Sequence, residues 1–421
     1  VFVERELAML HQPERARCRR ESRRPRRPRV WVRNYIRRAA VLGLFLAAAC
    51  GSSTSDSATA EPRTYRIRRL ADSPVARSGH LAIAMADGSA LVMGGNSSEA
   101  VNVPDSSSTE RFDPVAETFS AGPTLVLSVL DGGFTLATPL RAGGFLLVGG
   151  GINSGIGLGI PSGALTQRFD AVRGVFARSG DLQRVRSGAD VTATLLGDGR
   201  VAAIGGGFPA RPSSEIYDPA TGQWTVAQDL QVARRGHTAT LLKDGRVLVA
   251  GGAVCCTASQ ETFTNVAEIY DPASGSSRLT GSLGQGRGFH RATLLADGRV
   301  LLTGGFGGNA TDSPTLAASE IFDPATGTFS ATGALQVPRL SHSAILLSDG
   351  RVLAVGGTKA DRSGVSETEL FDPRTGKWTA GPLLAPAWAG VTATLLGNGK
   401  VLLFGGEDAA GFPRPDTFLV E

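Results

Sequence analysis

The sequence predicts an all-β fold, a seven-bladed β-propeller whose blades are four-stranded antiparallel sheets. Three observations predict it. A hairpin typified by HTATLLKDGRVLVAGG, His237 to Gly252, recurs seven times along the chain. A further strand motif and a tight turn follow most copies after a loop of variable length. The ends of the repeat region are complementary, because the last repeat lacks a fourth strand and the start of the region supplies one.

Every copy of the hairpin ends in a Gly-Gly pair. The pairs begin at Gly94, Gly149, Gly205, Gly251, Gly304, Gly356 and Gly405. This period of roughly 50 residues is typical of propeller blades. Another glycine stands six residues before each pair, after Asp in five copies and after Ala142 and Asn398 in the others. Asp-Gly favours a two-residue type I′ turn. Both flanking strands are apolar, which indicates burial on both faces near a central axis.

The outer half of each repeat is also regular. The third strand begins at Glu110, Gln167, Glu215, Glu268, Glu320 and Glu369 in the first six copies. A turn of the PATG type follows, in which Pro presets φ and Gly takes the left-handed conformation. The fourth strand carries the aromatic residues Phe119, Phe176, Trp224, Phe329 and Trp378. The fourth repeat has Ser277 and Arg278 there, which predicts weaker packing at its outer edge.

The ends of the repeat region predict a closed ring. After the seventh Gly-Gly pair, Asp416 to Glu421 supply a third strand with no fourth after it. The segment from Thr64 to Leu70 has the pattern of a fourth strand without the first three. We therefore expect this N-terminal strand to complete the last blade, which joins the ends and protects the sheet edges.

Four strands per repeat, a Gly-Gly pair and a Trp or Phe on the last strand resemble the kelch repeat. The hairpin is similar to that of galactose oxidase-type propellers, and the resemblance covers Arg63 to Glu421. It implies copper-radical oxidation, for which that family uses tyrosines, one of them linked to a cysteine, and two histidines. Here Tyr65, Tyr217 and Tyr270 occupy the repeat's own aromatic positions. We therefore expect the fold without that activity, and no cofactor.

The segment 1–49 has the features of an export signal. Arg33, Arg37 and Arg38 precede an apolar run from Ala39 to Ala49, as in a secretory signal peptide. The end of this segment, LFLAAACGSS from Leu44 to Ser53, resembles a bacterial lipoprotein signal, which implies lipidation of Cys50 and an outer-membrane anchor facing the periplasm or the cell surface. Residues 1–29 are rich in Arg and Pro, and we interpret them as a misassigned start. Residues 50–62 are small and polar, as expected of a tether, and 63–421 form the propeller.

The basic character of the chain belongs to this leader. Residues 1–49 hold 13 Arg and four Glu, whereas the remainder holds 30 basic and 34 acidic residues. The propeller is therefore slightly acidic, which argues against nucleic-acid binding by the fold. No run of 18 or more apolar residues occurs, so the membrane contact we expect is the lipid anchor alone. We expect a monomer.

Candidate ligand-binding residues open the innermost strands. Three copies have an Arg-x-x-His pattern, Arg77 with His80, Arg287 with His290 and Arg339 with His342. In a fourth copy Arg234 has the same spacing to His237, and Arg235 stands beside Arg234. One interpretation is a basic ring at the mouth of the axis that binds a carboxylate or sulfate. The other is a repeated structural role, since three copies lack the histidine. A metal site is disfavoured because the histidines come from four different blades.

The loops between the second and third strands are long, varied and rich in Ser, Thr, Gly and Asn. Variable loops on a rigid scaffold usually carry binding, which predicts a protein or glycan ligand. One of these loops holds Cys255 and Cys256, which form a vicinal disulfide or stay unpaired. The expected function is non-catalytic binding at the cell envelope. The alternative is a carbohydrate-active oxidase or lyase with a site at the mouth.

Overall fold

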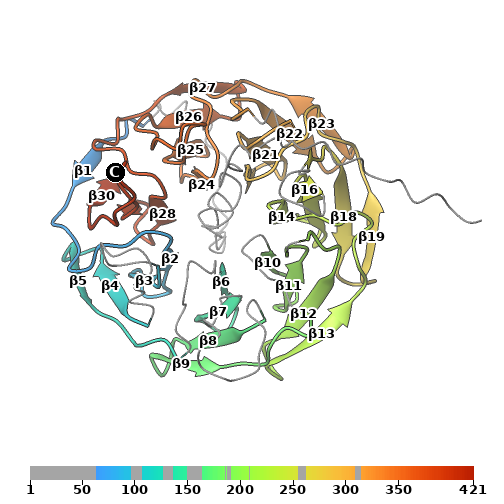
Figure 1. Cartoon of the computed structure of the whole chain (residues 1–421), viewed down its shortest axis with the longest axis horizontal. Coiled ribbons are helices and arrows are strands. Elements are labelled where there is room, and N and C mark those ends of the chain that lie inside the picture. The colour runs from blue at the N-terminus through green and yellow to red at the C-terminus, as the bar shows by residue number, and fades with distance from the viewer. Residues whose placement is uncertain are drawn as a thin grey trace, which may run out of the picture.

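The computed structural model describes residues 63–95, 107–126, 136–148, 164–184, 186, 191–207, 209–254, 262–308 and 314–421. These residues form seven four-stranded antiparallel sheets arranged in a ring (Figure 1). The described ranges contain no α-helix, and accordingly none that is long and apolar enough to cross a membrane. The predicted seven-bladed propeller is confirmed.

Each blade runs from an innermost to an outermost strand in chain order. Blade 1 comprises β2 (Leu81–Ala84), β3 (Ala90–Met93), β4 (Thr109–Asp113) and β5 (Thr118–Ala121). Blade 2 comprises β6 (Leu136–Pro139), β7 (Phe145–Val148), β8 (Thr166–Asp170) and β9 (Val175–Arg178). Blade 3 comprises β10 (Thr192–Leu195), β11 (Val201–Ile204), β12 (Ser214–Asp218) and β13 (Gln223–Ala227).

Blade 4 contains one extra hairpin. Its main sheet comprises β14 (Thr238–Leu241), β15 (Val247–Ala250), β18 (Ala267–Asp271) and β19 (Ser276–Leu279). The strands β16 (Ala253–Val254) and β17 (Thr262–Phe263) pair with each other between β15 and β18. The fourth strand forms in full register although it lacks the aromatic residue of the other blades, and Ser277 donates a hydrogen bond to Glu268 at 2.7 Å.

The last three blades close the ring. Blade 5 comprises β20 (Arg291–Leu294), β21 (Val300–Thr303), β22 (Ser319–Asp323) and β23 (Thr328–Ala331). Blade 6 comprises β24 (Ser343–Leu346), β25 (Val352–Val355), β26 (Glu369–Asp372) and β27 (Lys377–Ala380). Blade 7 comprises β28 (Thr392–Leu395), β29 (Val401–Phe404), β30 (Thr417–Val420) and, as its outer strand, β1 (Ile67–Arg69).

The N-terminal strand completes the last blade as the sequence predicts. β1 pairs antiparallel with β30, with Ile67 opposite Val420 and Arg69 opposite Phe418. Arg68 of β1 reaches onward to Glu117 of blade 1 through two hydrogen bonds of 2.9 and 2.6 Å. The strand therefore covers the edge of β30 and links the seventh blade to the first.

The tight hairpin turn differs in type from the prediction. A type I′ turn requires positive φ at both central residues. In blade 4 Gly245 has φ of 87°, while Asp244 is not among the residues with positive φ. The N–H of Gly245 donates to the Leu242 carbonyl, and Leu242 and Arg246 close the loop through a 2.8 Å bond. This is the three-residue hairpin loop, in which a single glycine takes the left-handed conformation. The prediction of a type I′ turn is wrong.

The hydrophobic core lies between neighbouring blades. One cluster joins Ile204 of blade 3 to Val249 of blade 4, and another joins Phe112 of blade 1 to Leu402 and Leu419 of blade 7. The second strands are fully buried in every blade, as their apolar sequences predict. Burial of side chains on both faces of each sheet holds neighbouring blades together.

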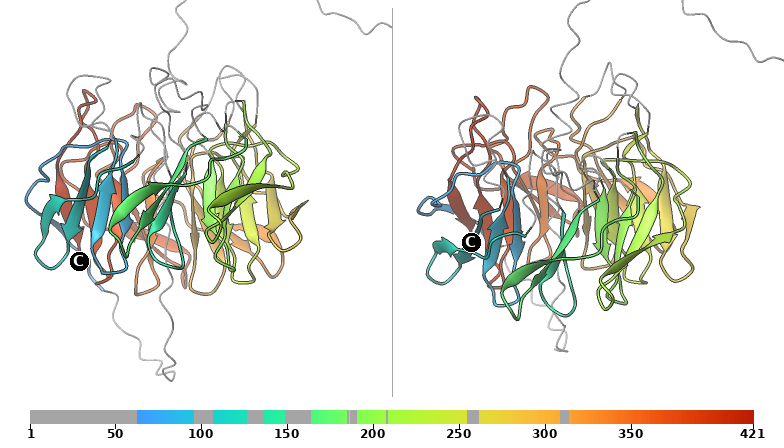
Figure 2. Two further views of the ribbon diagram at one scale, coloured as in Figure 1. Left: turned by 90° about the horizontal axis from the view of Figure 1, so that it is seen from below. Right: turned by 60° about the horizontal axis from the view of Figure 1, so that its bottom comes forward.

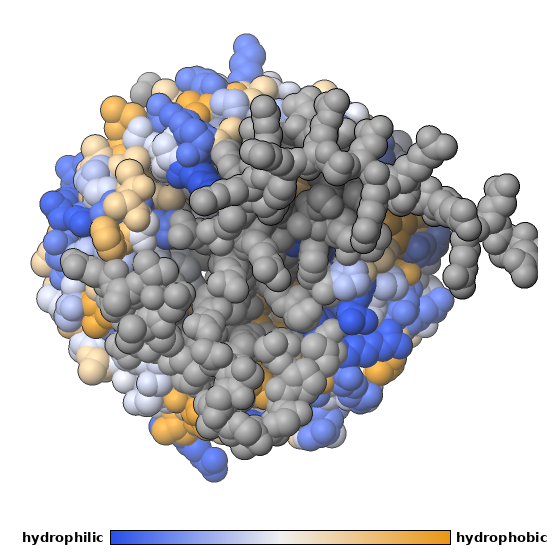
Figure 3. Space-filling view, viewed as in Figure 1, coloured by the Kyte–Doolittle hydropathy of each residue, from blue (hydrophilic) through white to orange (hydrophobic). Residues whose placement is uncertain are grey.

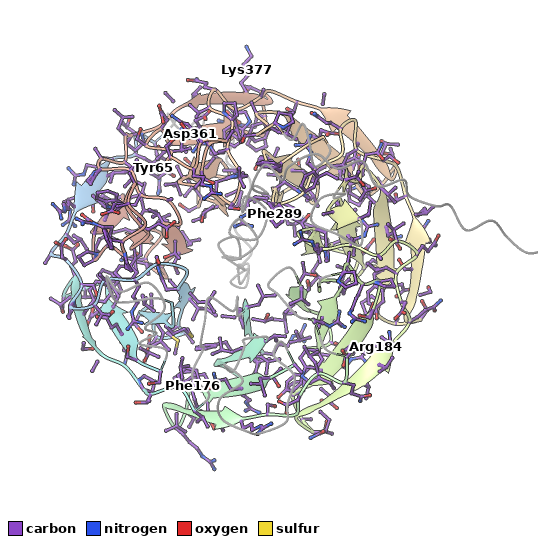
Figure 4. The ribbon with its side chains drawn as sticks, in the orientation of Figure 1. Tyr65, Phe176, Arg184, Phe289, Asp361 and Lys377 are labelled. Carbon is purple, nitrogen blue, oxygen red and sulfur yellow. The ribbon has the colours of Figure 1, made fainter. Side chains whose placement is uncertain are left out.

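The two faces of the ring differ in their connections. The short turns within blades gather at the lower edge in Figure 2, and we call this side the turn face. The connections between second and third strands and between blades lie at the upper edge, and we call this side the long-loop face. Figures 1 and 3 look onto the long-loop face, where hydrophilic residues gather at the lower right, near the position of Arg184 in Figure 4.

Candidate functional site

The repeated arginines are buried ion-pair partners. Each precedes the innermost strand of its blade and contacts a glutamate on the third strand of the same blade. The pairs are Arg77–Glu110 at 3.1 Å, Arg186–Glu215 at 3.1 Å, Arg234–Glu268 at 2.6 Å, Arg287–Glu320 at 2.5 Å and Arg339–Glu369 at 2.7 Å. All five arginine side chains are 0% exposed. Their positive charges are satisfied inside the blades.

The same arginines bind backbone carbonyls. In blade 6 the Arg339 guanidinium donates to Glu367 at 2.8 Å and to Gly356 at 3.3 Å. The equivalent bonds recur in blades 4 and 5. The glutamates of blades 3 to 6 in turn accept backbone N–H groups, as Glu369 does from Gln336 at 2.6 Å, whereas Glu110 of blade 1 accepts from the Ser73 hydroxyl at 2.8 Å. The pair therefore fixes the connection that enters each blade to the two strands beside it.

The histidines join one blade to the next. His290 shares a hydrogen bond of 3.0 Å with Thr238 of the preceding blade through Nε2, and His80 shares one of 2.9 Å with Thr392 across the closure of the ring. His237 and His342 make the same kind of contact with Thr192 and Thr303. All four rings are buried, with 0–5% exposure.

The Gly-Gly pairs provide the space for these rings. A Cβ on Gly251 would lie 3.0 Å from Cε1 of His290 in the next blade. A Cβ on the second glycine, Gly252, would lie 2.9 Å from Cβ of His237 in its own blade. The N–H of Gly252 donates to the Arg287 carbonyl of the next blade at 2.8 Å. The glycines, the arginine and the histidine thus form one recurrent junction between blades.

Burial keeps the histidines neutral. It lowers the pKa of His80 to about 3, and the charge of Arg77 acts in the same direction. Burial, followed by the neighbouring Arg287, also holds the pKa of His290 well below its usual range. His237 and His342 behave alike, with burial as the main cause. A neutral buried ring is suited to the junction between blades.

The structure shows where the residues of the predicted basic ring lie. The candidates Arg77, His80, His237, Arg287, His290, Arg339 and His342 all lie in the junctions between blades, and the structure gives each a structural role. In the fourth blade the ion-paired residue is Arg234. The predicted Arg235 is its neighbour, 1% exposed, and its backbone pairs with Ala253. Binding of an anion by these residues stays untested.

Sequence reasoning missed Arg186. It stands five residues before Val191, whereas the other arginines stand three residues before the histidine position. Counting forward from the preceding glutamine reveals it, because Gln183 precedes Arg186 by three residues as Gln231 precedes Arg234, and the N–H of each glutamine bonds the glutamate of its blade. The predicted Cys50, Cys255 and Cys256 lie outside the described residues.

A cluster of phenylalanines lies on the long-loop face between blades 4 and 5. The Phe263 ring is edge-on to the Phe289 ring at 6.2 Å and to the Phe306 ring at 5.8 Å between centroids. All three side chains are half-buried. Figure 4 shows Phe289 at the inner rim of the ring of blades. We call these three residues the rim aromatics.

The backbone beneath the rim aromatics is fixed by close packing. Gly288 pairs with Phe306 through bonds of 2.9 and 2.8 Å, and Phe289 donates to the Gly236 carbonyl at 2.8 Å. A Cβ on Gly288 would lie 2.6 Å from the Phe263 ring, and one on Gly236 would lie 2.8 Å from the Phe289 ring. Two glycines are thus required for the rings to approach the loop backbone closely, which fixes the positions of the rings.

Phe289 has a strained backbone. Its φ is 54°, in the left-handed region that bulky side chains avoid. The equivalent residues before the innermost strands are Gly79, Gly236 and Gly390 in three other blades, and Ser341, with φ of 53°, in blade 6. A phenylalanine here costs roughly 1–2 kcal/mol. Strain of this kind is concentrated at functional sites. The phenylalanine at a glycine position of the repeat is the feature that sequence reasoning could have used.

The described residues do not supply a copper site of the kind the fold resemblance implies. No group of three or more His, Cys, Asp or Glu side chains among them could hold a metal ion. The four repeat histidines bond threonines in separate junctions. Tyr217 is buried and bonds Ser179 at 2.6 Å, and Tyr270 is buried in the core of blade 4. We therefore derive no chemical step through copper.

Comparison with known proteins agrees with this architecture. The family model described as Kelch motif matches residues 339–382, which begin at Arg339 and include the Gly-Gly pair, Glu369 and Trp378 of blade 6. No curated protein sequence matches the chain significantly. A solved structure described as a novel fungal alcohol oxidase with catalytic diversity among the AA5 family, in complex with copper, is similar in fold. It has a TM-score of 0.67 at 18% identity, covering 85% of this chain and 76% of that one.

The fold and its repeated junctions define a seven-bladed β-propeller. Within that class, this chain is a seven-bladed ring with a kelch motif in its sixth blade, and it is similar in fold to an AA5-family oxidase.

Proposed function

We propose that the protein is a non-catalytic binding scaffold that captures a carbohydrate or protein ligand on its long-loop face. The rim aromatics are the observation that carries the proposal. They keep apolar surface partly exposed on the long-loop face, and Phe289 is held there against its backbone preference. Aromatic rings contribute large contact areas and are enriched in binding sites.

Carbohydrate is the ligand class we place first. A sugar ring stacks an apolar face on an aromatic side chain, while its hydroxyl groups bond polar neighbours. The rim aromatics supply the apolar surface, and the sequences of the connections between second and third strands, rich in Ser, Thr, Gly and Asn, supply candidate polar neighbours. A protein ligand that inserts an apolar side chain between the rings is the other form of the proposal.

A glycan array tests the proposal with matched variants. Phe289→Gly removes one ring and installs the residue that three other blades carry, so it should melt within a few degrees of the wild type. Ser341→Gly makes the same backbone change in blade 6 without touching the rim aromatics. We expect the wild type and Ser341→Gly to bind the same glycans, and Phe289→Gly to lose them. Equal glycan binding by all three chains would exclude the rim aromatics as the ligand-binding site.

An oxidase is the second candidate, suggested only by the fold of the AA5 relative. Oxidation of a carbohydrate alcohol by the chain with added Cu(II), measured as peroxide released, would favour it. The described residues contain no group of side chains that could hold copper, so we rank oxidase activity below ligand binding.

The proposed location is the bacterial cell envelope. A signal in residues 1–49 would direct export, and lipidation of Cys50 would anchor the propeller to the outer membrane through the tether 50–62. The support is the sequence pattern of basic, apolar and small residues that ends in Cys50. A scaffold anchored in this way would present its ring to ligands of the periplasm or the cell surface.

A further inference from the structure

A groove opens on the turn face between blades 2 and 3, on the opposite side from the rim aromatics. Its volume is about 780 Å³, within the range of small-molecule sites. The turn between β6 and β7 forms one wall, and the turn between β12 and β13, from Pro219 to Gly222, forms the other. Figure 2 brings blade 2 to the front, with its turns at the lower edge.

Three arginines line this groove against a single aspartate. Arg168 lies on β8, Arg173 in the turn after it and Arg178 on β9, and Asp170 is the acidic residue among the lining side chains. The Asp170 carboxylate accepts the N–H groups of Val172 and Arg173 at 3.0 and 3.1 Å, so it caps its own turn. The groove is therefore positively charged.

Blade 1 shows what an arginine at the Arg168 position normally contacts. Arg111 holds the equivalent place on β4, opposite Leu91 as Arg168 is opposite Leu146. Its Nε donates to the Ser89 hydroxyl at 3.0 Å, and its Nη2 donates to Asp87 at 2.5 Å. Both partners come from the hairpin turn of the same blade, so the charge of Arg111 is satisfied locally.

Blade 2 has lost both partners. Ala142 replaces the aspartate and Gly144 replaces the serine in the turn between β6 and β7. The Nε of Arg168 is buried and has no acceptor among the described residues. Its Nη1 donates only a long bond, 3.4 Å, to the Pro219 carbonyl. A buried donor without an acceptor is unfavourable, so the Arg168 guanidinium lacks the local compensation that Arg111 has in blade 1.

The flanking charges reinforce Arg168. The Arg173 side chain is 80% exposed and its Nε lies 4.0 Å from Asp170, a distance at which the pairing is weak. Arg178 pairs with Asp181 at 2.6 Å and still lines the groove. The small side chains of Ala142 and Ala220 leave room above Arg168, and Gln223 and Thr221 bring an amide and a hydroxyl group to the same wall.

We propose that this groove binds a uronic-acid residue of an acidic carbohydrate, with its carboxylate on the Arg168 guanidinium in the place that the Asp87 carboxylate takes on Arg111 of blade 1. A guanidinium edge matches a carboxylate through two parallel hydrogen bonds. The sugar ring fits against Ala142 and Ala220, and its hydroxyl groups face Gln223 and Thr221. The site lies on the other face from the rim aromatics and does not depend on the function proposed for them.

Titration calorimetry of the full chain with trigalacturonate tests this site. Ala142→Asp is the decisive variant, because it restores the carboxylate that Arg111 has in blade 1. It also creates the Asp-Gly turn present in five other blades, so the fold should be kept. We expect this variant and Arg168→Gln to weaken binding about tenfold or more. Arg111→Gln in blade 1 is the matched control and should bind as the wild type does.

The ligand series separates the alternatives. The methyl ester of trigalacturonate has the same shape without the charge and should bind at least tenfold more weakly. No binding of trigalacturonate by the wild type, or equal binding by Ala142→Asp, would overturn the site. Inorganic sulfate or a glutamate-rich peptide that binds as tightly as trigalacturonate would overturn its assignment to a uronic acid. Phe289→Gly should leave this binding unchanged, which keeps the test separate from the long-loop face.

Discussion

Replacing Arg339 by methionine tests whether the repeated arginines are structural. The guanidinium is 0% exposed and bonds Glu369 at 2.7 Å, the Glu367 carbonyl at 2.8 Å and, less closely, the carbonyls of Gly356 and Val337. Methionine keeps most of the volume and removes every one of these bonds. Glu369, itself only 1% exposed, then loses its counter-charge. Breaking a buried pair in this way costs about 3–5 kcal/mol.

The assay is the thermal midpoint of unfolding by differential scanning calorimetry. We expect Arg339→Met to lower it by on the order of 10 °C. Arg374→Met is the matched control in the same blade, because Arg374 pairs with Asp372 at 3.1 Å but is 73% exposed. Such a surface pair contributes about 0–1 kcal/mol. Adding Glu369→Gln to Arg339→Met should recover part of the loss, since the neutral amide oxygen still accepts from the N–H of Gln336.

Equal effects of Arg339→Met and Arg374→Met would refute the structural role of the buried pair. A further loss on adding Glu369→Gln would refute the argument that the unpaired carboxylate causes the damage.

Two further predictions concern pH and the membrane anchor. Burial lowers the folded-state pKa of the junction histidines, to about 3 for His80, whereas the unfolded imidazole takes up a proton near pH 6.5. The stability of the propeller should therefore be full above about pH 6.5 and fall as the pH is lowered toward the folded-state pKa, by about 1.4 kcal/mol per pH unit for each histidine. Melting curves at pH 7.5 and 5.5 check this, and a His80→Gln chain that loses as much as the wild type would contradict it. For the anchor, Cys50→Ala should move the protein from the membrane fraction to the soluble fraction of a bacterial host. Mass spectrometry should find acyl chains on the wild type alone. Identical fractionation of both chains would contradict lipidation.

The repeat pattern was sufficient to predict the ring, because each part of it is local in sequence. Gly-Gly pairs at a fixed distance from a turn glycine define the inner hairpin in each copy, and the unpaired segment before Leu70 predicted the closure with β30. The turn type was not predictable in the same way. Asp-Gly occurs both in type I′ turns and in three-residue loops, and only the number of residues between the closing hydrogen bonds distinguishes them.

The roles of the arginines depended on contacts distant in sequence. Arg339 meets Glu369 from a different strand of its blade, and the sequence alone gives no distance between them. The glutamates do recur in register, and the exceptions are informative. Blade 2 has Gln167 in place of the glutamate, and blade 7 has Trp388 at the arginine position with Phe418 at the glutamate position. Deviations from the repeat also mark Phe289 and Ala142, the two positions on which the proposed sites depend.

The binding function of the long-loop face is the central claim, and an affinity comparison tests it most directly. The strongest ligand found on the glycan array would be titrated into the wild type, Phe289→Gly, Ser341→Gly and Ala142→Asp, each first shown to be folded by its melting curve. We predict that Phe289→Gly alone weakens binding, by about tenfold or more, and that the other two variants match the wild type. Binding that survives in Phe289→Gly, while that chain melts as the wild type does, would contradict a ligand site at the rim aromatics.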